Sequence, residues 1–194
     1  MEKINNNKLP KIIGITGKKF HGKDTIAQYL CEKYGYMQIA YATPLKEICR
    51  ILFGFDNDQL YGNKKEEIDE RWKISPRKLF QYIGTDLFRN QLGNIIPDIG
   101  DKFWIKCLEE NIIKMINKNP DIKIVVSDIR FQNEIDSLKL LNKETIKDKI
   151  MIIRVERPNL NKDTDVHSSE LIDTLENIDY DIKNDSDLVT LYRK

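Results

Sequence analysis

The sequence predicts an α/β protein in which a five-stranded parallel sheet is covered by helices on both faces. Two observations lead to this prediction. Short apolar runs alternate along the chain with segments of helical spacing, which is the pattern of strands joined by crossover helices. The runs contain almost no polar residues, as expected of strands that are buried on both faces. The 194 residues suffice for a sizeable core, so we expect residues 1–194 to form one domain.

The expected elements follow one another in a regular order. Strands are expected at 11–16, 37–41, 122–128, 149–155 and 179–184. Helices are expected at 24–34, from Pro44 to Gly54, at 75–92, 101–117 and 131–141, and near the end of the chain. The first of these helices has one apolar face, formed by Ile26, Ala27 and Leu30. Such a face is typical of a helix that packs on a sheet.

Local signals mark other parts of the chain. Ser75 and Pro76 are typical of the N-cap and the first position of a helix. Residues 56–74 are polar and rich in charge, and we expect them to form a mobile, variable excursion. Residues 1–10 are expected to be a flexible tail. The polar segment 56–74 therefore interrupts the regular alternation of strands and helices.

The composition limits the class of partner. Lys and Arg (32) nearly equal Asp and Glu (31), which argues against a dedicated nucleic-acid binder. No run reaches the roughly 18 apolar residues of a membrane span, and the first residues lack the apolar stretch of a signal peptide. The distant Cys31, Cys49 and Cys107 form no C-x-x-C pair and are typical of reduced thiols. We expect a cytoplasmic protein (in the host's cytoplasm if the source is viral) with no nucleic-acid or membrane partner, and a homodimer stays open.

The segment GITGKKFHGKDT (14–25) carries the strongest functional signal. Gly17 is followed, after four residues, by Gly22 and Lys23, which is the spacing of a phosphate-binding loop. This segment lies between an expected strand and an expected helix. The glycines let backbone N–H groups face an anion, the helix N-terminus favours negative charge, and Lys23 would bridge the β- and γ-phosphates of a bound nucleotide. Lys19 and His21 are expected to face solvent and to have no role.

Asp24 stands where this loop usually has Ser or Thr. A carboxylate binds Mg²⁺ at least as well as a hydroxyl does, directly or through water, and Thr25 supplies a hydroxyl next to it. The sequence therefore predicts a magnesium site at Asp24 and Thr25, within a loop that is intact.

Ligands of parallel sheets bind at the carboxyl ends of the strands, so the residues that follow the strands matter most. These are residues 17–24, 42–46, 128–130, 156–158 and 184–186. Asp128 is expected either to organise the metal or the acceptor or to cap a helix, and both roles stay open. Arg130 follows shortly after it.

Four further blocks occur in order: RKLFQYIGTDLFRN with FW (77–90, 103–104), SDIRFQNE (127–134), RPN…HSSE (157–170) and DIKNDSDL (181–188). Together with GKDT they resemble the phage-type deoxynucleoside monophosphate kinases. The resemblance spans most of the chain. It implies a P-loop kinase fold with a lid at 157–170, and transfer of the γ-phosphate of ATP, with Mg²⁺, to a deoxynucleoside 5′-monophosphate for dNTP supply.

The resemblance also implies residue roles. The catalytic residues would be Lys23, Asp128 and Arg130. Arg157 and Asn184 would join Gly17, Gly22, Lys23, Asp24 and Thr25 in binding ATP. The acceptor would be bound by Lys46, Arg77, Gln81, Thr85, Arg89, Trp104 and Arg130, and His167 and Glu170 would belong to the lid. Arginine suits such roles because its planar fork grips phosphate oxygens bidentately.

Purely structural roles are the alternatives to these functional roles. Arg77 and Arg89 could form surface ion pairs, Trp104 is more typical of a core, and Glu134 is expected to pair with an arginine. His167 is favoured as a structural or lid-closing hydrogen-bonding residue, because an acceptor phosphate is already ionised at neutral pH and needs no general base.

Other functions remain as alternatives. A regulatory GTPase would need an Asn-Lys-x-Asp motif, and NKET (142–145) and NKDT (161–164) both lack the final Asp. A non-catalytic nucleotide-binding protein would not need Lys23 and several arginines. Dephospho-coenzyme A kinase and phosphomevalonate kinase share the general layout, but the GTD…R…FW block favours a nucleotide acceptor.

Overall fold

The computed structural model describes residues 9–141, 146, 148–158 and 172–193. Its contacts divide the chain into two compact units. The first, here called the sheet unit, comprises residues 1–40 and 108–194, and the second, the helical unit, comprises residues 41–107. None of the described helices is both long and apolar enough to span a membrane.

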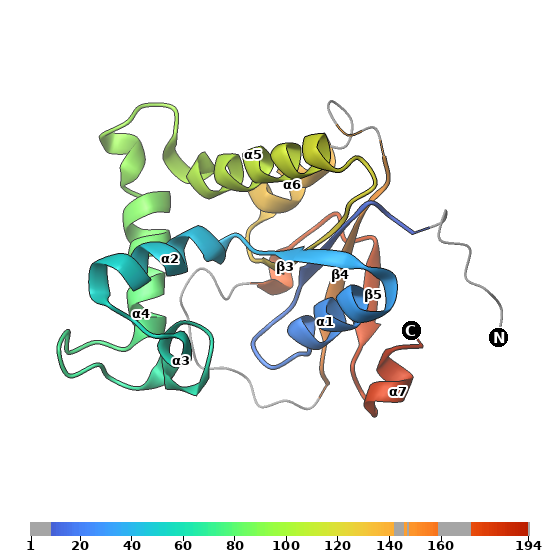
Figure 1. Cartoon of the computed structure of the whole chain (residues 1–194), viewed down its shortest axis with the longest axis horizontal. Helices are drawn as coiled ribbons and strands as arrows, with labels where there is room; N and C mark the ends of the chain where they lie inside the picture. Colours follow the sequence, from blue (N-terminus) through green and yellow to red (C-terminus); the bar gives the residue numbers. More distant parts are fainter. Residues whose placement is uncertain (1–8, 142–145, 147, 159–171, 194) are drawn as a thin grey trace. The chain divides into compact units, whose positions relative to one another are not determined.

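The sheet unit contains five parallel strands in the order β2-β3-β1-β4-β5. Figure 1 labels β3, β4 and β5 of this sheet. The five strands are β1 (Ile12–Thr16), β2 (Tyr36–Ile39), β3 (Lys123–Ile129), β4 (Ile150–Glu156) and β5 (Tyr180–Lys183). Each lies within two residues of the range expected from the sequence. The prediction of a five-stranded parallel sheet is confirmed, and β1, which leads into the phosphate loop, is its central strand.

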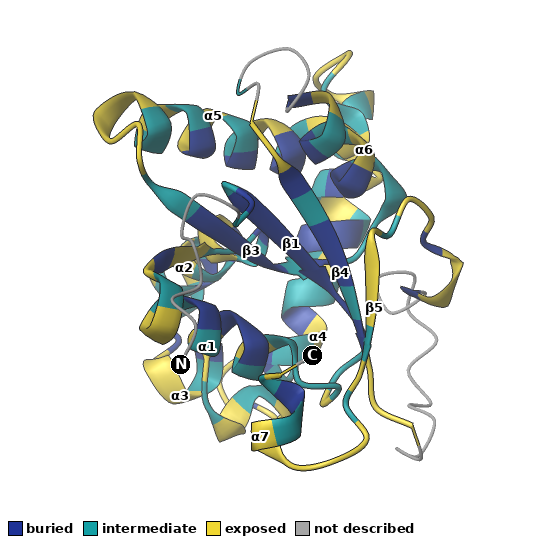
Figure 2. Ribbon diagram, turned by 90° about the vertical axis from the view of Figure 1, so that its right-hand side faces the viewer, coloured by how far each residue is buried: buried dark blue, intermediate teal, exposed yellow. Residues whose placement is uncertain are grey.

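Helices cover both faces of this sheet, and Figure 2 shows its central strands as buried. The helices of the unit are α1 (Lys23–Tyr34), α6 (Gln132–Leu141), α7 (Leu188–Leu191) and the second part of α5 (Phe103–Lys118). The apolar face predicted for α1 joins Ile13 and Ile15 of β1 in one cluster, together with Leu191 of α7.

The opposite face of the sheet is packed against α6. A Cβ atom at Gly14 of β1 would lie 2.5 Å from Cδ1 of Ile129, 2.8 Å from Cδ1 of Ile152 and 3.5 Å from Cδ1 of Leu138 on α6. Side chains from both neighbouring strands and from α6 thus meet over Gly14. The central strand is buried on both faces, which explains its nearly all-apolar sequence; the hydroxyl of the buried Thr16 donates a 2.9 Å hydrogen bond to the Ile129 carbonyl.

The helical unit consists of short elements. They are α2 (Ala42–Phe53), α3 (Asn57–Leu60), η2 (Asn63–Glu66), α4 (Pro76–Gln81), the π-helix η3 (Tyr82–Arg89), and the 3₁₀ turns η4 (Leu92–Asn94) and η5 (Gly100–Lys102). Helix α4 begins as predicted, because the Ser75 side chain accepts a hydrogen bond from the Lys78 N–H and Pro76 follows as the first helical residue.

The expected single helix over 75–92 is wrong in its second half. Residues 82–89 form a π-helix, a wide and rare type that is frequent at functional sites. The Gly84 carbonyl accepts a 2.8 Å hydrogen bond from the indole N–H of Trp104, a donor from outside the helix. An outside donor that inserts into the helical hydrogen-bond ladder is a known cause of such local distortion.

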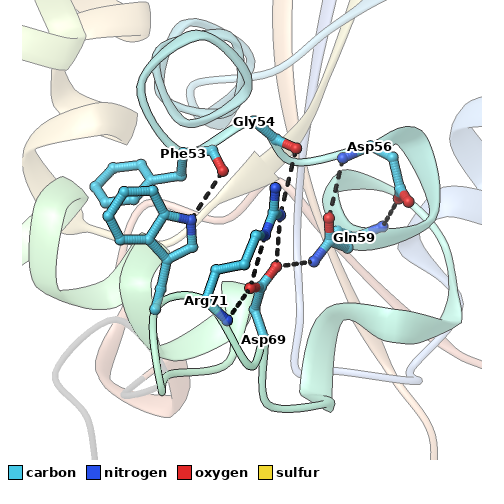
Figure 3. Close-up of polar contacts among 7 residues, drawn as sticks. Phe53, Gly54, Asp56, Gln59, Asp69 and Arg71 are labelled. Atoms are coloured by element: carbon cyan, nitrogen blue, oxygen red, sulfur yellow. Dashed lines mark hydrogen bonds and ion pairs between the residues drawn. The ribbon is translucent and has the colours of Figure 1, made fainter.

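The segment 56–74, expected as a mobile excursion, is folded around the carboxylate of Asp69 (Figure 3). One carboxylate oxygen accepts hydrogen bonds from the backbone N–H and Nε of Arg71 at 2.9 and 3.0 Å. The other accepts from Nη2 of Arg71 at 2.6 Å and from Nε2 of Gln59 at 2.7 Å. Asp69 is 8 % exposed, and Phe55 and Leu60 nearby in the chain are fully buried. The charges of Asp69 and Arg71 therefore hold this segment together.

The same segment closes the end of α2. Trp72 donates its indole N–H to the Phe53 carbonyl at 2.9 Å, and Arg71 donates to the Gly54 carbonyl at 3.4 Å. Asp56 and Gln59 form a capping box at the start of α3, with hydrogen bonds of 2.9 and 3.1 Å. These side chains bind the carbonyl and N–H groups that helix ends leave without partners.

Replacing Asp69 with asparagine is expected to lower the melting temperature by several degrees. An amide has one acceptor oxygen where the carboxylate has two, and its NH₂ group would face the donors of Arg71 and Gln59. The exposed Asp58→Asn is the matched control. Equal melting temperatures for wild type and Asp69→Asn at pH 7 would show that the Asp69 carboxylate does not stabilise this segment.

The pH dependence of the melting temperature is a second test of the same variant. Hydrogen bonds from Arg71 hold the pKa of Asp69 well below its usual value. The stability that this carboxylate contributes is therefore present above its unfolded-state pKa of about 3.9 and declines as the pH falls below that value. The difference in melting temperature between wild type and Asp69→Asn should be larger at pH 7 than near pH 3.

Candidate active site

The phosphate loop joins the central strand β1 to α1 and needs both of its glycines. Gly17 has φ 146°, and a Cβ atom there would lie 2.4 Å from the Val155 carbonyl oxygen. Gly22 has φ 106°, and its Cβ would lie 2.7 Å from Nδ2 of Asn184. Side chains rarely adopt these backbone angles, and neither position has room for one. The loop is thus pressed against the carboxyl ends of β4 and β5.

Lys23 is the first residue of α1, and its ammonium group donates a 2.8 Å hydrogen bond to the Lys18 carbonyl of the same loop. This contact holds the cation over the loop. Asp24 and Thr25 occupy the following two positions in the first helical turn. The helix N-terminus, the ammonium group and the turning backbone together form a site suited to a polyphosphate.

The residues around Asp24 fit a magnesium ion. Its carboxylate is exposed and the neighbouring Thr25 is half-buried, so both can supply hard oxygen ligands. Among the residues that the structure describes, no three His, Cys, Asp or Glu side chains cluster as a metal site. Mg²⁺ usually keeps several waters and binds through one or two protein groups plus phosphates, so a sparse set is suitable.

Asp128 and Arg130 lie at the carboxyl end of β3, as predicted. Asp128 is in the strand itself, and the residue directly before α6 is Phe131, so Asp128 does not occupy the N-cap position of that helix. Glu134 is 2 % exposed, and its Oε2 accepts hydrogen bonds from the backbone N–H groups of Arg130 at 2.8 Å and Phe131 at 3.2 Å. Glu134 was expected to pair with an arginine, and its carboxylate accepts a hydrogen bond from the backbone N–H of Arg130.

The ends of β4 and β5 are tied to the loop. Asn184 directly follows β5, and its Nδ2 donates to the His21 carbonyl at 3.0 Å while its backbone N–H donates to the Glu156 carbonyl at 2.7 Å. Arg157 directly follows β4 and is exposed. Both residues predicted to meet the donor nucleotide therefore lie beside the phosphate loop.

The expectation that His21 faces solvent is wrong. The ring is half-buried, and its Nδ1 lies 3.2 Å from the Val155 carbonyl oxygen and 3.3 Å from the Arg157 backbone nitrogen. Lys18 of the same loop pairs with the carboxylate of Asp173 in η8 (Ile172–Thr174). No local sequence signal marks either contact, because the partners are more than 130 residues away in the chain.

The predicted acceptor residues belong to the helical unit, except for Arg130. Arg77 and Gln81 are one helical turn apart on α4, and Thr85 and Arg89 are buried in the π-helix. Nη1 of Arg89 donates to the Asp101 carbonyl at 3.3 Å. The ammonium group of Lys46 lies 4.2 Å from the centre of the Tyr61 ring.

Trp104 is 5 % exposed and packs against the rings of Phe88 and Phe103, with centroids 5.0 and 4.8 Å away. These contacts, with the hydrogen bond to Gly84, support a packing role for Trp104. The lid residues His167 and Glu170, and most of the segment 157–170, lie outside the described residues.

Comparisons with known proteins agree with this picture. The profile of a family described as "Deoxynucleotide monophosphate kinase" matches residues 53–194. A protein of Acanthamoeba polyphaga mimivirus, assigned as a deoxynucleotide monophosphate kinase, is 38 % identical over 163 residues, which cover 82 % of this chain and 80 % of the relative. A deoxynucleoside-5′-monophosphate kinase of Escherichia phage T5 is 37 % identical over 84 residues, which cover 43 % of this chain and 29 % of the relative.

Two kinases are among the solved structures with a similar backbone arrangement. A gluconokinase from Sinorhizobium meliloti 1021 has a TM-score of 0.46 at 13 % identity, covering 95 % of this chain and 88 % of its own. A dephospho-CoA kinase from Campylobacter jejuni has a TM-score of 0.47 at 14 % identity, covering 95 % of this chain and 93 % of its own.

Proposed function

Because the chain belongs to the deoxynucleotide monophosphate kinase family, we propose that it transfers the γ-phosphate of ATP to a deoxynucleoside 5′-monophosphate, giving the diphosphate. The observation that carries this proposal is the intact phosphate loop, with Lys23 at the start of α1, in a chain of that family. Family membership also favours a nucleotide acceptor over dephospho-coenzyme A or phosphomevalonate, and a kinase over a GTPase or a non-catalytic nucleotide-binding protein.

Phosphoryl transfer needs positioning and charge stabilisation more than covalent chemistry from the protein. We assign Lys23 and the loop N–H groups to the β- and γ-phosphates, and Arg130 to the phosphoryl group in flight. The acceptor phosphate is largely ionised at neutral pH, so its oxygen needs no general base. Arg157 and Asn184 are assigned to the donor nucleotide, and Asp128 to the ordering of water or acceptor near the end of β3.

The acceptor contacts are assigned mainly to the helical unit. Cationic groups there can grip the acceptor phosphate bidentately, and amide or hydroxyl groups can bind the nucleoside. The residues assigned are Lys46, Arg77, Gln81, Thr85 and Arg89. We assign Trp104 to packing within the helical unit, on the evidence of its buried ring.

A divalent cation completes the donor site. Mg²⁺ supplies positive charge to the β- and γ-oxygens when bound, and Asp24 and Thr25 are the residues that would hold it, partly through water. We also propose that the protein works in the cytoplasm with nucleotides as its partners and without nucleic acid. A homodimer is one assembly to be tested, by light scattering on the purified chain.

A coupled assay of ADP release tests the function. ATP and Mg²⁺ are supplied with each deoxy- and ribonucleoside monophosphate in turn, with phosphomevalonate and dephospho-coenzyme A as further acceptors. At least one deoxynucleoside monophosphate is expected to stimulate ADP release strongly. Release with phosphomevalonate or dephospho-coenzyme A, but with no monophosphate, would overturn the assignment of substrate.

Replacing Asp24 with asparagine is expected to raise the Mg²⁺ concentration needed for half-maximal rate severalfold. The two side chains are similar in size, so the change isolates charge, and Thr25 still offers a hydroxyl. In the absence of metal, the variant should bind ATP as tightly as wild type or more tightly, because the substitution removes a negative charge beside the polyphosphate. Titrations of ATP with and without Mg²⁺ measure both effects.

Asp58→Asn is the matched control, because it removes an exposed carboxylate from the first turn of another helix, α3. A carboxylate that only complements the helix dipole contributes about 0.3–1 kcal/mol to stability. A lower melting temperature for Asp24→Asn with an unchanged Mg²⁺ curve would therefore assign Asp24 to the helix and not to the metal.

A further inference from the structure

Three polar groups of His21 have hydrogen-bonding neighbours in the protein. Its backbone N–H donates to the Lys18 carbonyl at 3.3 Å, which curls the phosphate loop. Its carbonyl accepts from Asn184 at 3.0 Å, and its ring Nδ1 faces both the Val155 carbonyl and the Arg157 N–H. One loop residue thus joins the loop to the residues at the carboxyl ends of both β4 and β5.

The two neighbours of Nδ1 make different demands on it. The Val155 oxygen can only accept a hydrogen bond, so it needs a proton on Nδ1, whereas the Arg157 N–H can only donate, so it needs a lone pair there. At a given moment a ring nitrogen offers one or the other. Only the state with a lone pair on Nδ1 binds the main chain of the first residue after β4.

The electrostatic surroundings favour the neutral ring. Partial burial lowers the pKa of His21 below its ordinary value of 6.5, and the nearby ammonium groups of Lys23 and Lys18 lower it further. The hydrogen bond from the ring to the Val155 carbonyl and the carboxylate of Glu156 act in the opposite direction. At pH 7 and above, Nδ1 is therefore able to carry the lone pair that accepts the Arg157 N–H.

We propose that His21 is a positioning residue that fastens the phosphate loop to the end of β4 through Nδ1, so that the loop is preformed for ATP and Arg157 is kept beside it. The proposal rests on the proposed function in one respect, namely that this loop binds the phosphates of ATP. A loop that is ordered before binding pays less ordering entropy when the nucleotide arrives. Loss of the tether should therefore weaken ATP binding.

Three variants separate Nδ1 from the rest of the ring. In His21→Asn, the side-chain oxygen and nitrogen occupy the position of Nδ1, so the amide can replace either hydrogen bond. In His21→Gln, the polar atoms lie one bond farther out, near the position of Nε2, and His21→Ala has none. We expect Asn to keep the dissociation constant of ATP within about threefold of wild type, and Gln and Ala to raise it about tenfold.

Two further readouts distinguish a tether from general damage. The affinity for the deoxynucleoside monophosphate and the melting temperature should change little in all three variants. Amide hydrogen exchange reports the Arg157 N–H directly and needs no nucleotide. The protection of that amide should survive in His21→Asn and fall in Gln and Ala. In wild type it should also fall on acidification with a midpoint below pH 6.5, whereas in His21→Asn it should not follow such a titration.

Each outcome decides the proposal. It is overturned if Asn and Gln behave alike, or if the wild-type Arg157 amide is unprotected at pH 7.5. Absence of ADP release with every monophosphate would count against the proposed function, and the exchange pattern at Arg157 would still decide whether the tether exists. Weaker ATP binding with an unchanged Arg157 amide would assign His21 another role and reject the tether.

Discussion

Replacing Lys23 with methionine is expected to lower kcat by about 10²- to 10³-fold, the loss typical of a single group that stabilises charge developing in the transition state. Lys23 lies at the first position of α1 and its ammonium group is held over the loop by the Lys18 carbonyl. Methionine has nearly the same length and no charge, so the loop should fold while the cation is lost. A coupled ADP-release assay under saturating ATP and acceptor measures the effect.

Lys33→Met is the matched control, because Lys33 lies on the last turn of the same helix and is exposed. It removes the same charge from α1 and should leave kcat within about twofold of wild type. If Lys23→Met retains most of the wild-type kcat, the loop does not act on the transferring phosphate, and the proposal of a kinase loses its main support.

Replacing Arg130 with lysine is expected to lower kcat by about 10²-fold or more while leaving ATP affinity nearly unchanged. Lysine keeps the charge but lacks the planar fork that can bind two phosphate oxygens at once. The carboxylate of Glu134 accepts hydrogen bonds from the backbone N–H groups of Arg130 and Phe131, so the main chain at this position is fixed in both proteins. The comparison therefore isolates the guanidinium group.

Steady-state kinetics and a separate ATP titration provide the two values. Arg193→Lys, an exposed substitution near the end of the chain, is the control and should leave both values unchanged. A kcat for Arg130→Lys equal to that of wild type would reduce Arg130 to a structural ion-pair residue. A parallel loss of ATP affinity would place Arg130 at the donor and not at the phosphoryl group in flight.

Much of the fold could be predicted because its signals are local. The strand ending at Thr16, the turn with Gly17 and Gly22, and the apolar face of the following helix lie within 20 residues of one another. Period, apolar content and glycine placement describe such a unit without reference to distant parts of the chain. The start of α4 at Ser75 and Pro76 was predictable for the same reason.

Residues 56–74 show how composition misleads. The segment was expected to be mobile because it is polar, yet the carboxylate of Asp69 and the guanidinium group of Arg71 are hydrogen-bonded to each other within it. A local signal existed in the Asp56…Gln59 spacing of a capping box, which predicts the start of a helix. We found no such signal for the π-helix, whose Gly84 carbonyl accepts a hydrogen bond from Trp104, 20 residues away.

The sequence by itself determined the parallel sheet, the phosphate loop with Lys23 and Asp24, and the kind of chemistry, since these depend on residue types at short, regular spacing. Only the tertiary structure decided that His21 binds the end of β4 and that Asn184 binds the loop carbonyl. Hydrogen bonds are directional and act over about 3 Å, so a side chain's partner depends on which strand ends the fold brings together.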